Sequence, residues 1–544
     1  MVTHPLHPLC HWLLAGLAVL SVPSVHADTA VKNKPAAKAP ASSAAAARAR
    51  AASQRLSSAQ ASGPVAMPVV QVESLSLQDA VVRLRQVNRA ILSKQGEAAI
   101  TATGIERAQA AFQPQITAAA VRGISAQKNT YEEELIRRTL GVYQREGNDF
   151  SLGVSTVVPA TGAKVELKSS LSRFITNNNI SDLSRPPGAY DNRSAVGLSL
   201  TQPLARDAGA EVTQAKLNMA RLDTTAAEHA SLDAETSVVA EAILLYQDLV
   251  FAQQRVAAAQ EKINTSTRLL GEAQALSRQG RLAQTDIWEV ENALARYRSA
   301  LSEAIQHQRE RSNRLRAMLM MEPSAVLFTA VDALPDVQAP LPDEAQESLR
   351  MALAKRDDYQ MRKVQVEREG IQLVYAKNQK LPRIDLVASY GLNGLEYGGR
   401  MAVNVQNMRP YPGWTFGVQA SLPLGTNKQA EADLQSAALR REDALLALQA
   451  MEAQIAADID TSVALQRSMH ERWGLWREVA ARELEQLAAE RAKFAAGRSD
   501  TRELLLRQER VINARLSVQE QQVGFARAQT LLHAAQGILM ERFP

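Results

Sequence analysis

Two periods of apolar residues alternate along the chain. From Ser76 to Phe112 and from Asp343 to Lys380, apolar side chains recur about every 3.6 residues, which predicts helices. A proline follows each segment, at Pro114 and at Pro382, and the period then falls to about two, which predicts strands. Both halves of the chain therefore switch from helix to strand at a proline.

The predicted strands have one apolar face and one small or polar face. The apolar positions are Phe150, Leu152, Val154, Val196, Leu198 and Leu200 in the first half, and Ile384, Leu386, Ala388, Tyr390, Trp414, Phe416, Val418, Ala420 and Leu422 in the second. Such strands suit a β-barrel with lipid outside and water inside, although a water-soluble β-sandwich shows the same alternation. In a barrel, we expect Tyr390, Tyr411 and Trp414 to lie in an interfacial girdle of aromatic residues.

A very long helical pattern follows the strands of each half. One runs from about Asp207 to Ala275 after Gln202-Pro203-Leu204, and the other from about Asn427 to Phe494 after Leu422-Pro423-Leu424. At 1.5 Å per residue each helix is roughly 100 Å long, so it has to pack as a coiled coil. The partners are return helices, which we expect from Leu282 to Met320 and from Asp500 to Leu539.

Each long helix is separated from its return helix by a Gly-Arg pair, Gly280-Arg281 and Gly497-Arg498. A tight reversal between antiparallel helices favours glycine, because glycine tolerates a positive φ. Since helix, strands, long helix and return helix occur twice in the same order, the pattern indicates an internal duplication. A barrel joined to long helical rods is an architecture typical of a conduit.

The duplication divides the chain into segments. We expect a signal peptide at 1–27, a disordered linker rich in Ala, Lys and Pro at 28–66, a first repeat at 67–322, a connector at 323–342 and a second repeat at 343–540. The signal rests on the apolar run from Trp12 to Val22 and on Val25-His26-Ala27 before the cleavage site; an uncleaved membrane anchor is the alternative. Cys10 precedes that run, so the exported chain would have no thiol.

Composition agrees with extended helical packing. The 544 residues are 46% hydrophobic but only 4% aromatic, so close helix packing by small side chains is favoured over a bulky globular core. Much of the net charge of +5 lies in the basic linker, which leaves the helical body close to neutral.

The first half contains more strand-like runs than the second. Four are predicted, namely Ile116 to Ile124, Phe150 to Val158, Lys164 to Phe174 and Ala195 to Leu204. The extra hairpin turns at Pro159-Ala160-Thr161-Gly162. It either enlarges a barrel, plugs its lumen or lies in an extracellular cap.

From about Leu75 to Leu539 the sequence resembles the outer membrane efflux protein family of TolC-like channels. The resemblance is carried by the paired proline switches, by the Gln202-Pro203-Leu204 and Leu422-Pro423-Leu424 motifs, and by the segments that begin at Gly280 and Gly497. It implies an α+β membrane protein in which a coiled-coil helical tunnel joins a transmembrane β-barrel. It also implies a homotrimer in the outer membrane of a Gram-negative bacterium, with the tunnel in the periplasm and four strands per chain in a twelve-stranded barrel.

The same resemblance assigns roles to the two helical tips. It implies that Gly280, Arg281, Thr285, Gly497 and Arg498 dock a periplasmic membrane fusion protein, which links the duct to an inner-membrane pump. Asp286, Glu503 and Phe494 would then form the periplasmic gate, with three copies of Glu503 in a cation-favouring ring. Replacing Glu503 with Ala is expected to weaken cation preference. Phenylalanine at 494 stands where relatives place a tyrosine, so packing or other charges hold this gate.

Other classes of function fit less well. No cofactor, nucleic-acid partner or catalytic constellation is expected, and His229, His307, His470 and His533 lack the paired spacing of a zinc site. The alternative is a periplasmic coiled-coil adaptor, which shares an export signal and long helices but needs only one hairpin. Small-molecule efflux and type I secretion use the same kind of duct, so the sequence does not identify the transported substrate.

Overall fold

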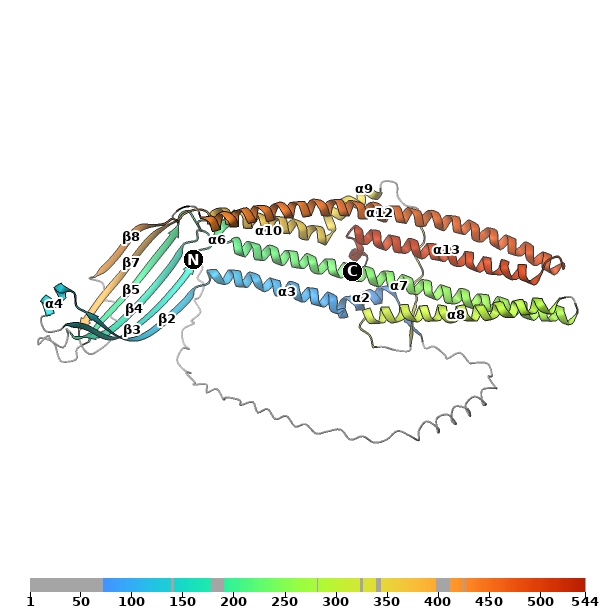
Figure 1. Cartoon of the computed structure of the whole chain (residues 1–544), viewed down its shortest axis with the longest axis horizontal. Helices are drawn as coiled ribbons and strands as arrows, with labels where there is room; N and C mark the ends of the chain where they lie inside the picture. Colours follow the sequence, from blue (N-terminus) through green and yellow to red (C-terminus); the bar gives the residue numbers. More distant parts are fainter. Residues whose placement is uncertain are drawn as a thin grey trace, which may run out of the picture. The chain divides into compact units, whose positions relative to one another are not determined.

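The computed structural model describes residues 72–137, 141–177, 190–280, 282–322, 326–338, 344–397, 411–423, 425 and 427–543. These residues belong to the unit Val70–Pro544, which contains long helices, a six-stranded sheet and a two-stranded sheet (Figure 1). The predicted signal peptide and linker, together with Arg281 and Leu424, lie outside the described residues. Long helices joined to an antiparallel sheet confirm the predicted α+β fold class.

The large sheet is antiparallel, with the order β2-β3-β4-β5-β7-β8. Its strands are β2 (Gln115–Lys128), β3 (Val142–Val157), β4 (Lys164–Thr176), β5 (Asp191–Pro203), β7 (Arg383–Tyr397) and β8 (Pro412–Ser421), and the short helix α4 (Tyr131–Arg137) lies between β2 and β3. All four strands predicted in the first half are confirmed. The implied number of four strands per chain is wrong for this protein, because the extra hairpin β3–β4 is inserted between β2 and β5 in the same sheet.

The helix that precedes the sheet in each half is broken once, where we expected a continuous helix. The pieces are α2 (Leu77–Val87) and α3 (Arg89–Gln109) in the first half, and α9 (Glu344–Lys355) and α10 (Asp357–Gln379) in the second. Asn88 and Arg356 at the breaks have extended backbone. The Asn88 side chain accepts a hydrogen bond from Ala90 N at 2.9 Å, as an N-cap does, and the Arg356 guanidinium donates to Asp358 at 2.7 Å.

The two helical hairpins have the expected lengths. They consist of α7 (Ala215–Arg278) with α8 (Gln284–Met318), and of α12 (Lys428–Ala495) with α13 (Thr501–Ala535) (Figure 1). α7 also packs against α3, α10 and α13, so it joins both halves of the chain. It begins later than the predicted Asp207, because a separate turn of helix, α6 (Ala210–Thr213), precedes it.

A small parallel pair lies beside the helices. Strand β1 (Val72–Leu75) pairs with β6 (Leu327–Ala330), which falls in the predicted connector. The pair covers a core in which Leu84, Leu249 and Phe328 are fully buried. The Tyr246 hydroxyl lies 2.9 Å from Leu75 O and 2.8 Å from Asp332 Oδ2, and burial raises its pKa. The sequence pattern did not predict this element, since each strand is only four residues long.

Candidate functional site

One face of the large sheet carries an apolar band that crosses all six strands. Backbone pairing aligns one side chain from each strand into a single row. In strand order the row is Ile116, Val154, Leu167, Leu198, Tyr390 and Trp414. Each of these side chains is exposed in the single chain, from 36% for Val154 to 74% for Trp414. A continuous exposed apolar band of this kind is normally covered by lipid or by another protein surface.

The opposite face carries small and polar side chains. One row consists of Gln115, Ser155, Glu166, Ser199, Ser389 and Thr415, and the neighbouring row of Thr117, Gly153, Lys168, Gly197, Gly391 and Gly413. The glycines of the second row have no side chain, and neighbouring atoms such as Thr117 Oγ1 approach them closely. The alternation predicted from the sequence is therefore confirmed, and the pairing register keeps it in phase across the sheet.

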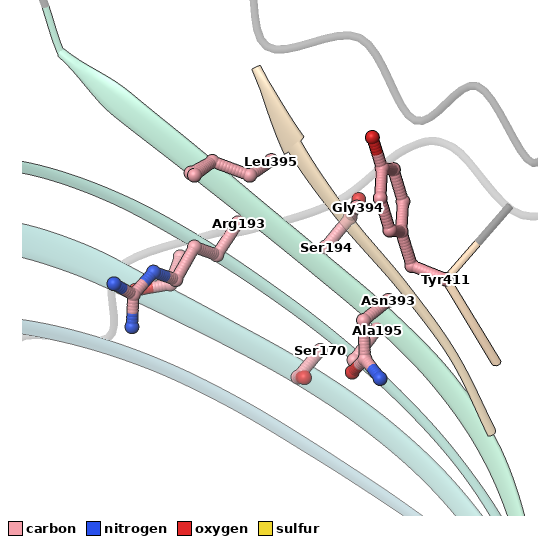
Figure 2. A pocket seen from close by; sticks show the side chains of 9 residues that line it. Ser170, Arg193, Ser194, Ala195, Asn393, Gly394, Leu395 and Tyr411 are labelled. Carbon is pink, nitrogen blue, oxygen red and sulfur yellow. The ribbon is translucent and has the colours of Figure 1, made fainter. Parts of the chain in front are cut away.

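The polar face is hollowed near Tyr411. A hollow of about 700 Å³ is lined by residues that include Ser170, Arg193, Asn393 and Tyr411 (Figure 2). Tyr411 thus lies on the polar face, whereas Trp414 pairs with Tyr390 on the apolar face. The expectation that Tyr411 belongs to an outward girdle is wrong. Residues three apart on a strand point to opposite faces, so Tyr411 and Trp414 cannot share one.

The tips of the two helical hairpins are built on left-handed glycines. Gly280 has a φ of 71° and Gly497 a φ of 70°, as the tight reversals require. At the second tip, Gly497 N donates to Phe494 O at 3.0 Å and Arg498 N donates to Lys493 O at 2.9 Å, the two bonds of a Schellman motif. Gly280, Thr285, Gly497 and Arg498 are all exposed.

A polar contact closes the second tip. The Ser499 hydroxyl donates to Glu490, and Lys493 Nζ lies 3.1 Å from Glu490 Oε2. These bonds hold the pKa of the Glu490 carboxyl below its ordinary range, the Ser499 bond contributing most. Sequence reasoning missed Glu490; the available signal was an acid seven residues before Gly497, two turns back along the same helix face.

The two predicted gate acids have different surroundings. Glu503 and Asp286 each lie in the first turn of a return helix, α13 and α8. Glu503 Oε1 accepts a bond from Arg507 Nε at 2.8 Å, and Asp500 Oδ1 caps the helix by accepting from Glu503 N. Among the described residues, Asp286 has no ion-pair partner. The Arg507 pairing was not foreseen, although an Arg four residues after a Glu on a helix is a familiar ion pair.

Phe494 takes part in apolar packing that joins both hairpins. It contacts a cluster of Leu269 from α7, Val290 from α8, Leu487 from α12, and Leu504 and Val511 from α13. A groove of about 340 Å³ lies beside it, lined in part by Arg268, Glu272 and Arg491. The structure thus brings Phe494 into the chain's own core near the tips.

The described residues contain neither a candidate membrane-spanning helix nor a candidate metal-binding cluster. No helix among them combines the length and apolar composition needed to cross a membrane. No group of three or more His, Cys, Asp or Glu residues in the same part of the chain is arranged to hold a metal ion.

The fold is that of the outer-membrane channels, as comparison with solved structures shows. The outer-membrane channel OprN is 15% identical, with a TM-score of 0.60 over 85% of this chain and 89% of that one. VceC from Vibrio cholerae is 14% identical, with a TM-score of 0.57 over 85% and 96%. The open state of MtrE from Neisseria gonorrhoeae is 16% identical, with a TM-score of 0.55 over 85% and 89%.

No family model and no curated protein matches the sequence. At 14% to 16% identity, the structural likeness establishes the fold. The geometry of this chain's own residues therefore has to carry the functional argument.

Proposed function

We propose that the protein is a passive exit duct in the outer membrane of a Gram-negative bacterium, leading from the periplasm to the exterior. The observation that carries the proposal is the exposed apolar row that crosses all six strands, backed by polar rows on the other face. Lipid covers an apolar band of this kind, and water fills a lumen lined by Ser, Thr and Gly.

Copies of the chain have to complete the barrel. Strands β2 and β8 are the outer strands of the sheet, and each pairs on one side only within the described part of the chain. Unpaired backbone groups at such edges are costly in lipid, so the sheet has to close. Closure by three copies, the number implied by the family resemblance, would pair β8 of one copy with β2 of the next. The four long helices of each copy would then surround a periplasmic tunnel.

The helical tips are the proposed contact with the rest of the machinery. Gly280, Thr285, Gly497 and Arg498 are exposed where a helical hairpin of a membrane fusion protein would dock. Arg281, proposed for the same surface, lies outside the described residues. Asp286, Glu503 and Phe494 form the proposed gate, which the adaptor opens and an inner-membrane pump drives. Tripartite efflux and type I secretion both fit this arrangement.

The segment boundaries belong to the same proposal. Residues 1–27 direct export and are removed, 28–66 form a linker, and the repeats 67–322 and 343–540 flank a connector at 323–342. The intact mass of the purified chain tests the cleavage directly. A mass equal to that of the full 544 residues would contradict it.

Reconstitution separates the duct from the alternative, a water-soluble periplasmic adaptor. The detergent-purified protein should have the mass of a trimer and should give discrete conductance steps in planar bilayers. The matched control is Leu198→Arg, which places a charge in the apolar row and should prevent insertion. A protein that stays monodisperse without detergent and never conducts would favour the adaptor.

A further inference from the structure

The inserted hairpin is fully integrated into the sheet. β3 pairs with β2 from Val142 to Ser155, and β4 pairs with β5 from Lys164 to Phe174. The two strands of the hairpin also pair with each other along their length. A plug or a cap would instead leave β2 free to pair with β5 directly. The hairpin therefore forms part of the sheet itself.

Both faces of the hairpin match those of its neighbours. On the apolar face Leu152 is 53% exposed and Leu167 is 50% exposed, much like Leu198 at 51% on β5. On the polar face Glu166 and Lys168 lie in the same rows as Ser199 and Gly197. The hairpin thus continues both the apolar band and the polar lining.

Polar-face side chains tie the hairpin to β5. Arg145 on β3 donates to Ser172 on β4 at 2.9 Å. The Phe174 ring lies between two guanidinium groups, 4.6 Å from that of Arg145 and 5.0 Å from that of Arg193 on β5. Phe174 also lies close to Gly147, where a Cβ would come within 2.6 Å of the Phe174 Cβ. These contacts fix the order of three neighbouring strands.

The turn of the hairpin is anchored where the sheet meets the helices. Thr161 O accepts bonds from Gly209 N at 3.4 Å and from Gln202 Nε2 at 3.1 Å. Gly162, with a φ of 78°, approaches Asp207 so closely that a Cβ would lie 2.6 Å from the Asp207 carbonyl oxygen. The segment around α6 accommodates this turn.

We propose that three copies of the chain close a barrel of eighteen strands, six from each, with a lumen wider than that of a twelve-stranded barrel. The inference rests on the proposed duct. Because barrel diameter grows roughly linearly with strand number, the barrel is about 1.5 times as wide as one of twelve strands, and its lumen widens by at least that factor because the lining side chains have the same length in both. Gly153, Gly197, Gly391 and Gly413 add no side chain of their own to this face. The barrel accordingly admits hydrophilic cargo too bulky for the narrower form.

A shortened variant with four strands per chain provides the comparison. Residues 123–191 are replaced by Asn-Gly, a two-residue hairpin loop that joins Arg122 to Asn192. Those two residues lie in the same row of the native sheet, so the loop keeps Ile116 opposite Leu198 and preserves the apolar row. Ser199→Cys, on the polar face, is introduced into both forms in a Cys10→Ser background. Leu198→Cys, on the apolar face, is the matched control.

Intact cells are treated with a small sulfonated thiol reagent and with maleimide-linked polyethylene glycols of increasing size. The largest polymer that labels Ser199→Cys should be at least about 1.5 times as wide in the whole chain as in the shortened form. Leu198→Cys should resist all of these reagents. If the whole chain and the shortened form both conduct but have the same size limit for labelling of Ser199→Cys, the wide barrel is overturned and the duct is not. Failure of the whole chain both to conduct and to label would overturn the duct.

Disulfide trapping tests the same inference in the whole chain, even where the shortened form does not fold. Ala119, Ser151, Ser170 and Ala195 lie side by side on the polar face of β2, β3, β4 and β5. Cysteine pairs at 119 with 151 and at 170 with 195 should cross-link in the membrane. The pair at 119 with 195 should not, because three strand spacings of about 4.8 Å separate these positions. Cross-linking of that pair alone would place the hairpin outside the wall.

Discussion

The two halves of the chain share helices, junctions and tips but differ where each meets the barrel. The first half contributes β2 to β5, and the second contributes β7 and β8. The segment between sheet and long helix is also longer in the first half, from Leu204 to Gln214 against Leu422 to Asn427. Its extra length contains α6 and receives the turn of the hairpin. The inserted hairpin is thus accompanied by a longer segment at the place where its turn docks.

The tips differ as well. At the second tip Glu490, seven residues before the glycine, is bonded to Ser499, two residues after it. The same positions in the first tip are Ala273, which is fully buried, and Leu282. The second tip is therefore closed by a polar pair that the first tip lacks. Any response of the first tip to acid has to come from other groups.

The largest expected effect concerns the hairpin that only the first half has. Leu167→Arg on β4 and Trp414→Arg on β8 alter the same apolar row, so each should destabilise the inserted barrel by about 2–4 kcal/mol. Folding into lipid vesicles at graded urea concentrations measures the change. Lys168→Arg, on the polar face, is the control. A Leu167→Arg protein as stable as the wild type would remove β4 from the lipid-facing wall.

Both tips should depend on glycine to the same degree. Gly280→Ala and Gly497→Ala force a side chain into the left-handed region, at a cost of about 1–2 kcal/mol each. Hydrogen exchange of the flanking helix ends should accelerate equally in the two variants. Gly271→Ala, within α7 and with open space around its Cβ position, is the control and should not loosen the tip. Unequal acceleration in the two variants would show that contacts outside the turn stabilise one of the tips.

Acid should loosen only the second tip through Glu490. Its carboxyl has a lowered pKa in the folded chain, so its contribution to stability is complete above the ordinary pKa of 4.5 and is lost as pH falls through the folded value. The protection of second-tip amides against hydrogen exchange, corrected for the intrinsic pH dependence of the exchange rate, should therefore fall below about pH 4.5. Glu490→Gln should remove that pH dependence. Persistence of the dependence in this variant would assign it to another group.

The smallest effect concerns ion selectivity. Arg507 neutralises Glu503, whereas four residues beyond Asp286 lies the buried Val290. Arg507→Ala should therefore raise cation preference about as much as Glu503→Ala lowers it, and Asp286→Asn should lower it clearly. Reversal potentials in a salt gradient measure each change. If Glu503→Ala alone abolishes selectivity, the Arg507 pair does not operate in the open duct.

Local patterns were enough to predict much of this fold. Pro114 and Pro382 indicate where helices give way to strands, and period-two alternation predicted every strand of the large sheet. The glycines at 280 and 497 predicted the reversals, since few other residues tolerate their φ. In each case a neighbouring stretch of sequence is sufficient, because the signal lies in backbone restriction or in periodicity.

Features that depend on distant partners could not be predicted in the same way. Alternation shows which residues share a face, but the position of the hairpin between β2 and β5 depends on strand pairing across the sheet. The break at Arg356 depends on contacts with Asp358 and Asp458. Tyr411 was assigned to the wrong face because the register near the start of β8 was not known, and a shift of one residue reverses the face.

Single-channel recording of the detergent-purified protein in planar bilayers, with its mass measured in the same preparation, tests the central claim most directly. The account predicts a trimer that gives discrete conductance steps. Leu198→Arg, purified in parallel, should give none. A water-soluble protein that never conducts would contradict the duct and return the chain to the adaptor alternative.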